Sequence, residues 1–446
     1  MTVERNVIEV VKEIARKIKD KGGRAFYVGG FVRDEFTYNV NKDIDIEIYG
    51  LPVSEVKSIL AEYGTVNEVG ESFGVLMVSG LPVDWTFPRT EKCIGKSHRD
   101  FDVTVNPFAS YEEACRRRDF TINAIMKDVL TDEIVDPFNG VKDIKDGILR
   151  CVNPTTFVED PLRVYRAAQF VARFNLTVDK NTMELLKTID VSSLPKERVY
   201  EEYKKMLLKA ERPSLGLQVL KEISLLHPLL KNMIGCKQKK EFHPEGDVWN
   251  HTLLVVDEAA KLRDMVSDPE ILMWSALLHD IGKSEVVSED GSSICHDEIG
   301  VELAMDFLKA FTNEGRLLQN VPIYVKEHMK LVQLWAHNSS TAAVMRLVSR
   351  VPDFNILIAL SKADFLGRGG VHDFTPVEEF IKVKTKDMGT KKPAPLVTGW
   401  DLISLGYKPS PLFGKILAWA FDLQLEGETK ENILKEIPLV FPIKDY

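Results

Sequence analysis

Residues 25–48 read AFYVGGFVRDEFTYNVNKDIDIEI, and this stretch decides the fold of the first third of the chain. Its apolar beginning predicts a short strand, the two glycines predict a turn, and the residues after them predict a helix. Isoleucines then alternate with acidic residues around Asp43 and Asp45, and this period of two predicts a second strand. Because side chains two positions apart on a strand point to the same face, the two aspartates are expected side by side.

The turn at Gly29 and Gly30 suits a phosphate group. A strand, a tight turn and the start of a helix leave backbone N–H groups free to bind an anion. Glycine lets a phosphate approach the backbone without a Cβ atom in the way. Arg33 follows one turn into the predicted helix, where its guanidinium can pair with a phosphate oxygen. The sequence therefore predicts a triphosphate site at this turn.

The carboxylates of Asp43 and Asp45 are candidate metal ligands. Neighbouring carboxylates repel each other unless a cation lies between them, and Mg²⁺ favours carboxylates together with phosphates. Asp84, on a strand predicted for residues 83–86, is a third candidate. Two Mg²⁺ ions about 4 Å apart could activate a hydroxyl nucleophile and stabilise a pyrophosphate leaving group. The alternative is a surface strand with alternating acids that follows an ordinary glycine turn.

The composition narrows the class of protein. The 446 residues are enough for two to four domains, and 44% hydrophobic with 28% charged residues is ordinary for a protein with large cores. We find no apolar run of the roughly 18 residues that a membrane span needs, and the first 20 residues lack the uninterrupted apolar stretch of a signal peptide. The five cysteines are far apart without a CxxC pair, which favours a reducing compartment. We therefore expect a cytoplasmic protein with no membrane partner.

Two polar motifs follow, RRDFTINAI at residues 117–125 and EDPLRVYRAAQF at residues 159–170. Their candidate nucleotide-binding side chains are Arg118, Asp119, Asn123, Asp160, Arg163 and Arg166. The spacing of three in the second motif places its three candidates on one face of a predicted helix. Each motif alone has a simpler explanation: Asp119 caps a basic helix start, and Asp160 forms a salt bridge with Arg163.

In their order, GGFVRD with KDIDIE, RRDFTINAI and EDPLRVYRAAQF resemble the class II tRNA nucleotidyltransferases, a family of CCA-adding enzymes and bacterial poly(A) polymerases. The resemblance covers about residues 23–235. It implies an α+β fold, with an N-terminal mixed α/β nucleotidyltransferase head of the polymerase-beta-like kind followed by all-helical neck, body and HD domains. The implied domains are a head over 1–150, a helical neck and body for base selection and RNA binding over 151–240, an HD domain over 241–375 and a C-terminal tail over 376–446.

The resemblance also implies roles for the motif residues. The three aspartates become the catalytic carboxylates, Arg118 and Asn123 contact the phosphate and sugar of the incoming nucleotide, and Asp119 organises the site. The implied activity is template-independent addition of C, C and A to the 3′ end of tRNA from CTP and ATP. Residues 89–113 resemble a flexible loop whose presence favours full CCA or A addition, and residues 136–140 resemble a hinge.

Asp160 and Arg163 can explain how a protein selects a base without a template. A carboxylate accepts from the amino group of cytosine or adenine, and a guanidinium donates to the ring nitrogen beside it. Uracil and guanine present a carbonyl oxygen and a ring N–H instead. They would leave buried polar groups unpaired, at roughly 1–3 kcal/mol per contact. The resemblance implies this role for the pair.

Six residues in the second half of the chain have the order and spacing of an HD-type metal site. They are His251, His279, Asp280, His296, His328 and Asp364. The set resembles the HD-superfamily phosphohydrolases, and imidazole with carboxylate suits Ni²⁺, Co²⁺, Mn²⁺ or Mg²⁺. A bound metal would lower the pKa of water for phosphoester cleavage. The resemblance implies phosphatase or 2′,3′-cyclic phosphodiesterase activity, and the alternative is that the scattered histidines have structural roles.

Two lysine clusters are candidate contacts to tRNA phosphates, with a solvated surface as the alternative. They are Lys237, Lys239 and Lys240, and Lys382, Lys384, Lys386, Lys391 and Lys392. The net charge of −9 argues mildly against nucleic-acid binding, but an acidic surface elsewhere can mask a local basic groove. The segment 396–417 resembles the family's tail and is expected to hold tRNA by shape.

Three functions are compatible with these residues. The first is a CCA-adding enzyme with an appended HD domain. The second is a poly(A) polymerase of the same family. The third belongs to another class, a metal-dependent phosphohydrolase whose head only binds nucleotide or RNA. A monomer or a homodimer is expected in each case.

Overall fold

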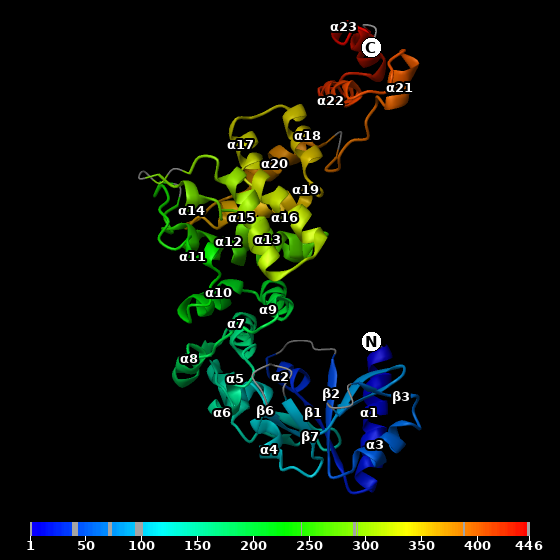
Figure 1. Ribbon diagram of the computed structural model, residues 1–446, viewed down its shortest axis with the longest axis vertical. Coiled ribbons are helices and arrows are strands. Elements are labelled where there is room, and N and C mark those ends of the chain that lie inside the picture. The colour runs from blue at the N-terminus through cyan, green and yellow to red at the C-terminus, as the bar shows by residue number, and fades with distance from the viewer. Residues whose placement is uncertain are drawn as a thin grey trace. The chain divides into compact units, whose positions relative to one another are not determined.

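The computed structural model describes residues 2–37, 43–69, 74–93, 101–241, 243–288, 291, 293–386 and 389–443. The chain folds into two compact units, and Figure 1 labels most of their helices and several of their strands. The first comprises Met1–Met206 and Leu215–Leu225, and the second comprises Leu207–Ser214 and Leu226–Tyr446. None of the described helices is long and apolar enough to cross a membrane.

A seven-stranded mixed sheet forms the centre of the first unit. Its strand order is β3-β4-β5-β2-β1-β8-β9; β2 and β5 run parallel, and the other neighbouring pairs are antiparallel. The strands are β1 (Arg24–Val28), β2 (Ile44–Tyr49), β3 (Val66–Val69), β4 (Val75–Val78), β5 (Leu81–Thr86), β8 (Met126–Asp128) and β9 (Ile134–Val135). The strand, turn and second strand predicted from residues 25–48 are thus confirmed as β1, the Gly29 turn and β2.

Helices of the first unit cover the sheet and continue beyond it. They are α1 (Thr2–Asp20), α2 (Gly30–Phe36), α3 (Val53–Leu60), α4 (Tyr111–Arg116), the 3₁₀ helix η1 (Thr121–Asn123), α5 (Gly140–Asp146), α6 (Pro154–Phe157), α7 (Arg163–Phe174), α8 (Lys180–Leu186), α9 (Lys196–Lys209) and α10 (Pro213–Glu222). Two short strands, β10 (Ile148–Leu149) and β11 (Thr177–Val178), pair in parallel. The last residues of α9 and the first of α10 belong to the second unit.

Alternation along β2 divides its side chains between the two faces of the sheet. Ile46 and Ile48 are fully buried in a core that they share with α1 and α3. Because neighbouring side chains on a strand point to opposite faces, Asp45, Glu47 and Tyr49 point to the other face. Tyr49 joins a second core there with residues of α4. The predicted site residues therefore lie on the face that α1 and α3 leave uncovered.

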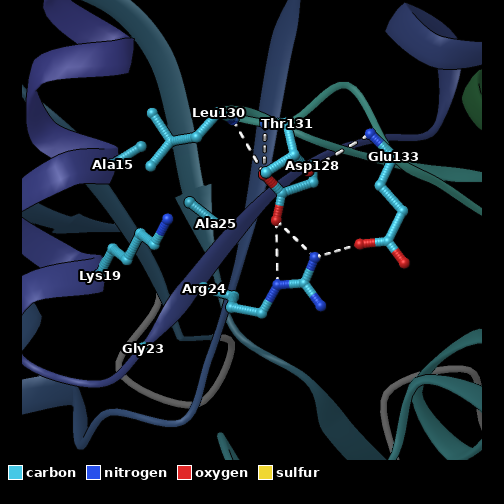
Figure 2. A pocket seen from close by; sticks show the side chains of 9 residues that line it. All are labelled: Ala15, Lys19, Gly23, Arg24, Ala25, Asp128, Leu130, Thr131 and Glu133. Carbon is cyan, nitrogen blue, oxygen red and sulfur yellow. Dashed lines mark hydrogen bonds and ion pairs between the residues drawn. The ribbon is translucent and has the colours of Figure 1, made fainter.

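An ion-pair cluster around Arg24 supports the far end of β1 (Figure 2). The guanidinium lies 2.7 Å from the carboxylates of Asp128, on β8, and Glu133. These residues line a cavity of about 320 Å³. Because Arg24 begins β1 and Gly29 follows its end, the cluster fixes β1 to β8 at the end of the strand away from the glycine turn.

The segment after Pro88 differs from the expected loop. Strands β6 (Arg89–Cys93) and β7 (Phe101–Val105) pair as an antiparallel hairpin, and α4 follows them. The loop prediction is therefore wrong for these residues, while residues 94–100 lie outside the described part of the chain. Residues 89–93 (RTEKC) lack apolar alternation, but residues 101–105 (FDVTV) alternate apolar and polar residues, a strand signal that the loop prediction overlooked.

The second unit is helical throughout its described residues. Its helices are α11 (Pro228–Lys231), α12 (Val248–Leu262), the 3₁₀ helix η2 (Arg263–Met265), α13 (Pro269–Leu278), α14 (Lys283–Val286), α15 (His296–Phe311), α16 (Gly315–Glu327), α17 (Lys330–Ala336), α18 (Thr341–Arg350), α19 (Phe354–Leu366), α20 (Thr375–Lys384), α21 (Gly399–Ser404), α22 (Leu412–Leu425) and α23 (Lys430–Val440). Helices α13 and α19 are apolar nearly all round, so they form the centre of the unit. The loop predicted for residues 382–395 begins later than expected, because α20 continues to Lys384.

Candidate active sites

The glycine turn of the first unit has the conformation that the sequence predicts. Gly29 is the N-cap of α2 with a φ of 65°, a region that residues with a side chain rarely adopt. A Cβ atom at this position would lie 3.6 Å from Arg118 Nη1 and 3.7 Å from Asp45 Oδ2. The backbone of the turn therefore comes close to both a cationic and an anionic side chain.

Three carboxylates meet beside this turn. Asp45 on β2 and Asp84 on β5 are direct partners in the parallel register, and Asp43 immediately precedes β2. The pKa of Asp45 is raised to about 6, because burial and the carboxylates of Asp84 and Asp43 together outweigh the opposing charge of Arg118. Mutual repulsion in a half-buried cluster is relieved by a hard divalent cation with oxygen ligands. The residues present thus fit Mg²⁺.

A cavity of about 330 Å³ lies next to Asp45. It is lined by all nine residues that the sequence proposes for nucleotide binding: Gly29, Gly30, Arg33, Arg118, Asp119, Asn123, Asp160, Arg163 and Arg166. Arg117 lines it as well. Residues from four separate stretches of sequence therefore converge on one polar, strongly cationic space.

Asp119 links several groups of this cavity. Its Oδ2 accepts from Arg166 Nε at 2.8 Å and Nη2 at 2.6 Å, and its Oδ1 accepts from Asn123 Nδ2 at 2.9 Å. Burial by itself would raise the pKa of Asp119, but Arg166 and Asn123 outweigh it and hold the pKa below its ordinary value. Asn123 Oδ1 accepts from Arg33 Nη1 at 2.7 Å. The network fixes two guanidiniums at the cavity wall.

Asp160 and Arg163 are not paired with each other among the described residues. Arg163 donates to the backbone carbonyls of Thr156, at 2.9 Å, and Arg117, at 2.6 Å. Asp160 Oδ1 accepts from Leu162 N at 3.1 Å, which caps the turn before α7. The prediction of one shared helix face is wrong for Asp160, because α7 begins only at Arg163. The two side chains still face the same cavity.

Sequence reasoning overlooked two residues at this site. The residues predicted from the sequence include Arg118 but not the adjacent Arg117, although both line the cavity. Glu47 is fully buried and lies 3.1 Å from Arg118 and 3.4 Å from Arg117. The period-two pattern of β2 could have identified Glu47, since it is the next residue after Asp45 on the same face.

The second unit gathers all six residues of the predicted HD-type site. His251 lies on α12, His279 and Asp280 follow α13, His296 begins α15, His328 follows α16, and Asp364 lies on α19. Each of the six is at most 5% exposed. Their ligand atoms form two groups: His251, His279 and Asp364, and Asp280, His296 and His328.

Asp280 lies between the two groups. Its Oδ2 is 3.3 Å from His279 Nε2, and its Oδ1 is 3.4 Å from His296 Nε2 and 3.6 Å from His328 Nε2. In the first group, His251 Nε2 lies 3.1 Å from Asp364 Oδ1. One carboxylate is thus placed to serve two neighbouring ions.

Hydrogen bonds of three imidazoles show which ring nitrogen is available to bind a metal ion. His279, His296 and His328 donate through Nδ1 to the carbonyls of Ala276, Ser293 and Val325, at 2.9, 2.8 and 2.6 Å. Because a carbonyl only accepts, each Nδ1 carries the proton and each Nε2 offers a lone pair. Among the described residues, Nε2 of His279 and His296 and Oδ1 of Asp280 are buried without a hydrogen-bond partner. This donor set fits divalent metal ions.

Further residues outside the predicted set contact this centre. Glu245 Oε1 lies 2.8 Å from His251 Nδ1 and 2.9 Å from His243 Nδ1, and its Oε2 accepts from Gly369 N at 3.0 Å. Lys283 Nζ lies 2.7 Å from Asp280 Oδ2. A cavity of about 210 Å³ opens over His296 and is lined by Gln238, Lys239, His243, Lys283, Gly291, Ser293 and His296. Contact of either lysine cluster with RNA stays a prediction.

Three domain families match the chain in succession. They are the poly A polymerase head domain at residues 25–150, the "probable RNA and SrmB- binding site of polymerase A" at residues 175–235, and the HD domain at residues 248–337. A "multifunctional CCA protein" of Stenotrophomonas maltophilia is 34% identical over 367 residues, which cover 78% of this chain and 87% of that protein.

Solved structures share the fold over nearly the whole chain. A Bacillus stearothermophilus CCA-adding enzyme in complex with CTP has a TM-score of 0.71 at 21% identity, covering 97% of both chains. A Thermotoga maritima CCA-adding enzyme complexed with tRNA has a TM-score of 0.62 at 19% identity, covering 97% of this chain and 95% of that one. Both likenesses confirm the predicted mixed head followed by helical domains.

Proposed function

The chain belongs to the family of multifunctional CCA proteins, and on this premise we propose that it adds C, C and A to the 3′ end of tRNA from CTP and ATP without a nucleic-acid template. One observation carries the proposal. A single cavity joins the glycine turn, the carboxylate face of β2 and the pair Asp160 and Arg163. It therefore offers a triphosphate cradle, a metal-binding face and polar groups for a base.

The transfer step needs groups that bind and orient its reactants. The triphosphate binds the N–H groups of the turn, and Arg33 and Arg118 neutralise its oxygens. The terminal 3′-hydroxyl of the RNA attacks the α-phosphorus, and the bond to the pyrophosphate breaks. Asp43, Asp45 and Asp84 would hold Mg²⁺, which supplies activation of the hydroxyl and neutralisation of the leaving group. No covalent intermediate on the protein is needed.

Asp160 and Arg163 select the base. The carboxylate accepts from the amino group of cytosine or adenine, and Arg163 keeps one N–H of each Nη for the ring nitrogen after binding two backbone carbonyls. Because Arg163 is held by the protein backbone, its donors are oriented before the nucleotide binds. Uracil and guanine leave both side chains with unpaired polar groups.

The HD centre hydrolyses phosphoesters. His251, His279 and Asp364 would hold one divalent ion and Asp280, His296 and His328 a second, with Ni²⁺, Co²⁺, Mn²⁺ or Mg²⁺ suited to such ligands. The ions would supply hydroxide for attack on phosphorus. A 2′,3′-cyclic phosphate or a terminal phosphate on a damaged tRNA end is the substrate that we assign to this centre.

The test is extension of a tRNA that ends at the discriminator base, with each nucleotide supplied alone and together. Two C residues should be added from CTP alone and a final A when ATP is also present. Asp45→Asn should reduce extension by at least about a thousandfold, because it removes about 4 kcal/mol of charge stabilisation. The exposed Asp146→Asn is the matched control and should extend normally.

Two other results would contradict the proposal. Long A tails without C incorporation would identify a poly(A) polymerase. Phosphoester cleavage by a protein that never extends any RNA would identify a hydrolase whose head only binds nucleotide or RNA.

A further inference from the structure

We infer that Glu47 is a positioning residue that holds Arg117 and Arg118 at the nucleotide cavity and prevents Arg118 from pairing with Asp45. The inference rests on the proposed nucleotidyl transfer. Glu47 lies two residues after Asp45 on the central strand β2, between β1 and β5. It has no exposed surface. A fully buried carboxylate is costly unless charged groups or hydrogen bonds compensate it.

The partners of Glu47 supply this compensation. Tyr49 donates from its hydroxyl to Oε1 at 2.5 Å. Arg118 and Arg117 each donate from Nη2 to Oε2, at 3.1 and 3.4 Å. One oxygen of the buried carboxylate thus receives two guanidiniums.

The two arginines need such a partner. They follow directly after α4, and their side chains line the same cavity, so their like charges repel each other. One carboxylate shared by both guanidiniums offsets this repulsion while both residues line the cavity. The effect extends to base selection, because the carbonyl of Arg117 accepts from Arg163 Nη2 at 2.6 Å.

The position of Arg118 explains why its ion pair with Glu47 matters for metal binding. Arg118 Nη1 and Asp45 Oδ2 both lie within 4 Å of the point that a Cβ atom on Gly29 would occupy. Without Glu47, the guanidinium would be drawn to the carboxylates beside the turn and would compete with the divalent cation. By holding Arg118 away from Asp45, Glu47 leaves the Asp45 carboxylate available to a metal ion and Arg118 available to a phosphate.

The experiment compares full-length Glu47→Gln with the wild-type protein. Glutamine keeps the size of the side chain and its acceptor for Tyr49 but removes the charge. We expect the KM for CTP and ATP to rise about tenfold. The Mg²⁺ concentration for half-maximal rate should also rise severalfold, with kcat at saturation of both changing less than about threefold. Exposed Glu68→Gln is the matched control and should leave all three quantities unchanged.

A purely structural role of Glu47 would lead to a different result. It would lower the melting temperature and the active fraction while KM and the Mg²⁺ dependence stayed at wild-type values, and that result would overturn the inference. If Glu47→Gln does not fold, Glu47→Asp tests the same point, because it restores the charge one methylene short. Its KM should exceed the wild-type value, and a wild-type KM with wild-type Mg²⁺ dependence would also overturn the inference. A wild-type protein that incorporates neither CTP nor ATP would refute the proposed function itself.

Discussion

The two proposed metal centres differ in how far their side chains are arranged for a metal ion before any ion binds. In the HD centre, six buried ligands come together, and three imidazoles already have their protons fixed by backbone carbonyls. In the head, Asp43 is exposed, Asp45 and Asp84 are partly exposed, and the raised pKa of Asp45 shows that the cluster is not compensated by the protein alone.

The difference indicates whether each metal ion binds before the substrate or together with it. A buried set of nitrogen and oxygen ligands can hold its ions without substrate. A half-open row of carboxylates lacks enough ligands for Mg²⁺, which then keeps waters or binds the phosphates of a nucleotide. We therefore expect the HD ions to belong to the protein and the head ions to arrive with CTP or ATP.

Of the substitutions that test this comparison, Asp280→Asn should cause the largest loss of activity. The change removes a charge that faces both ligand groups, so metal content should fall. Cleavage of bis-p-nitrophenyl phosphate should decrease by roughly a thousandfold or more, since metal chemistry contributes several kcal/mol. CCA addition should stay within about twofold, because the head is a separate compact unit. Elemental analysis of the purified protein and both activity assays measure these outcomes.

The exposed Asp306→Asn, on α15, serves as the matched control for Asp280→Asn. Should Asp280→Asn retain its ions, or lose both activities together, the view of a separate, protein-held centre is wrong.

Glu245→Gln should have an intermediate effect. Glu245 lies 2.8 Å from His251 Nδ1 and is itself fixed by Gly369 N, so it holds the ring with Nε2 toward Asp364. Loss of such an outer carboxylate typically weakens metal binding by about 10–100-fold. Competition with a chelator gives the metal dissociation constant directly. Glu241→Gln, an exposed residue of the same segment, is the control, and equal affinities in the two variants would show that the HD centre is not prepared in this way.

Sequence reasoning succeeded where chemistry is carried by local pattern. The Gly29 turn and the alternation around Asp45 predicted a strand, a turn and a second strand within 24 residues, and the structure confirms them. The six residues predicted for an HD-type site also lie together, although His251 and Asp364 are 113 residues apart. Their residue types and order carried that signal, while their convergence on one buried point required the packing of α12, α13 and α19.

Sequence reasoning failed where a residue works through its surroundings. Glu47 and Glu245 look like ordinary acidic residues in the sequence, because their roles depend on burial and on partners far along the chain. The helix face that Asp160 was predicted to share with Arg163 is another case, and the salt bridge offered as the alternative does not form between these two residues. Backbone carbonyls of Thr156 and Arg117 attract the guanidinium instead, and the sequence gives no sign of unpaired carbonyls at those positions.

Asp160→Asn should cause the smallest change in activity. It tests the head, whose side chains are less firmly held than the HD ligands. Apart from its bond to Leu162 N, the carboxylate has only a distant ion pair with Arg198, at 3.7 Å, within the described part of the chain. Asparagine can turn its amide to donate to the carbonyl oxygen of uracil or guanine, whereas Arg163 still rejects the ring N–H. Discrimination of CTP against UTP should therefore fall by only about tenfold, the equivalent of one hydrogen bond.

Single-nucleotide incorporation with CTP and UTP, compared as kcat/KM, measures this discrimination. Glu159→Gln, the adjacent residue that does not line the cavity, should discriminate as the wild type does. If Asp160→Asn keeps wild-type selectivity, the protein recognises the base through groups as firmly held as the HD ligands. The head would then be preorganised for the base even though it is not preorganised for the metal, and the contrast between the two centres would be confined to their ions.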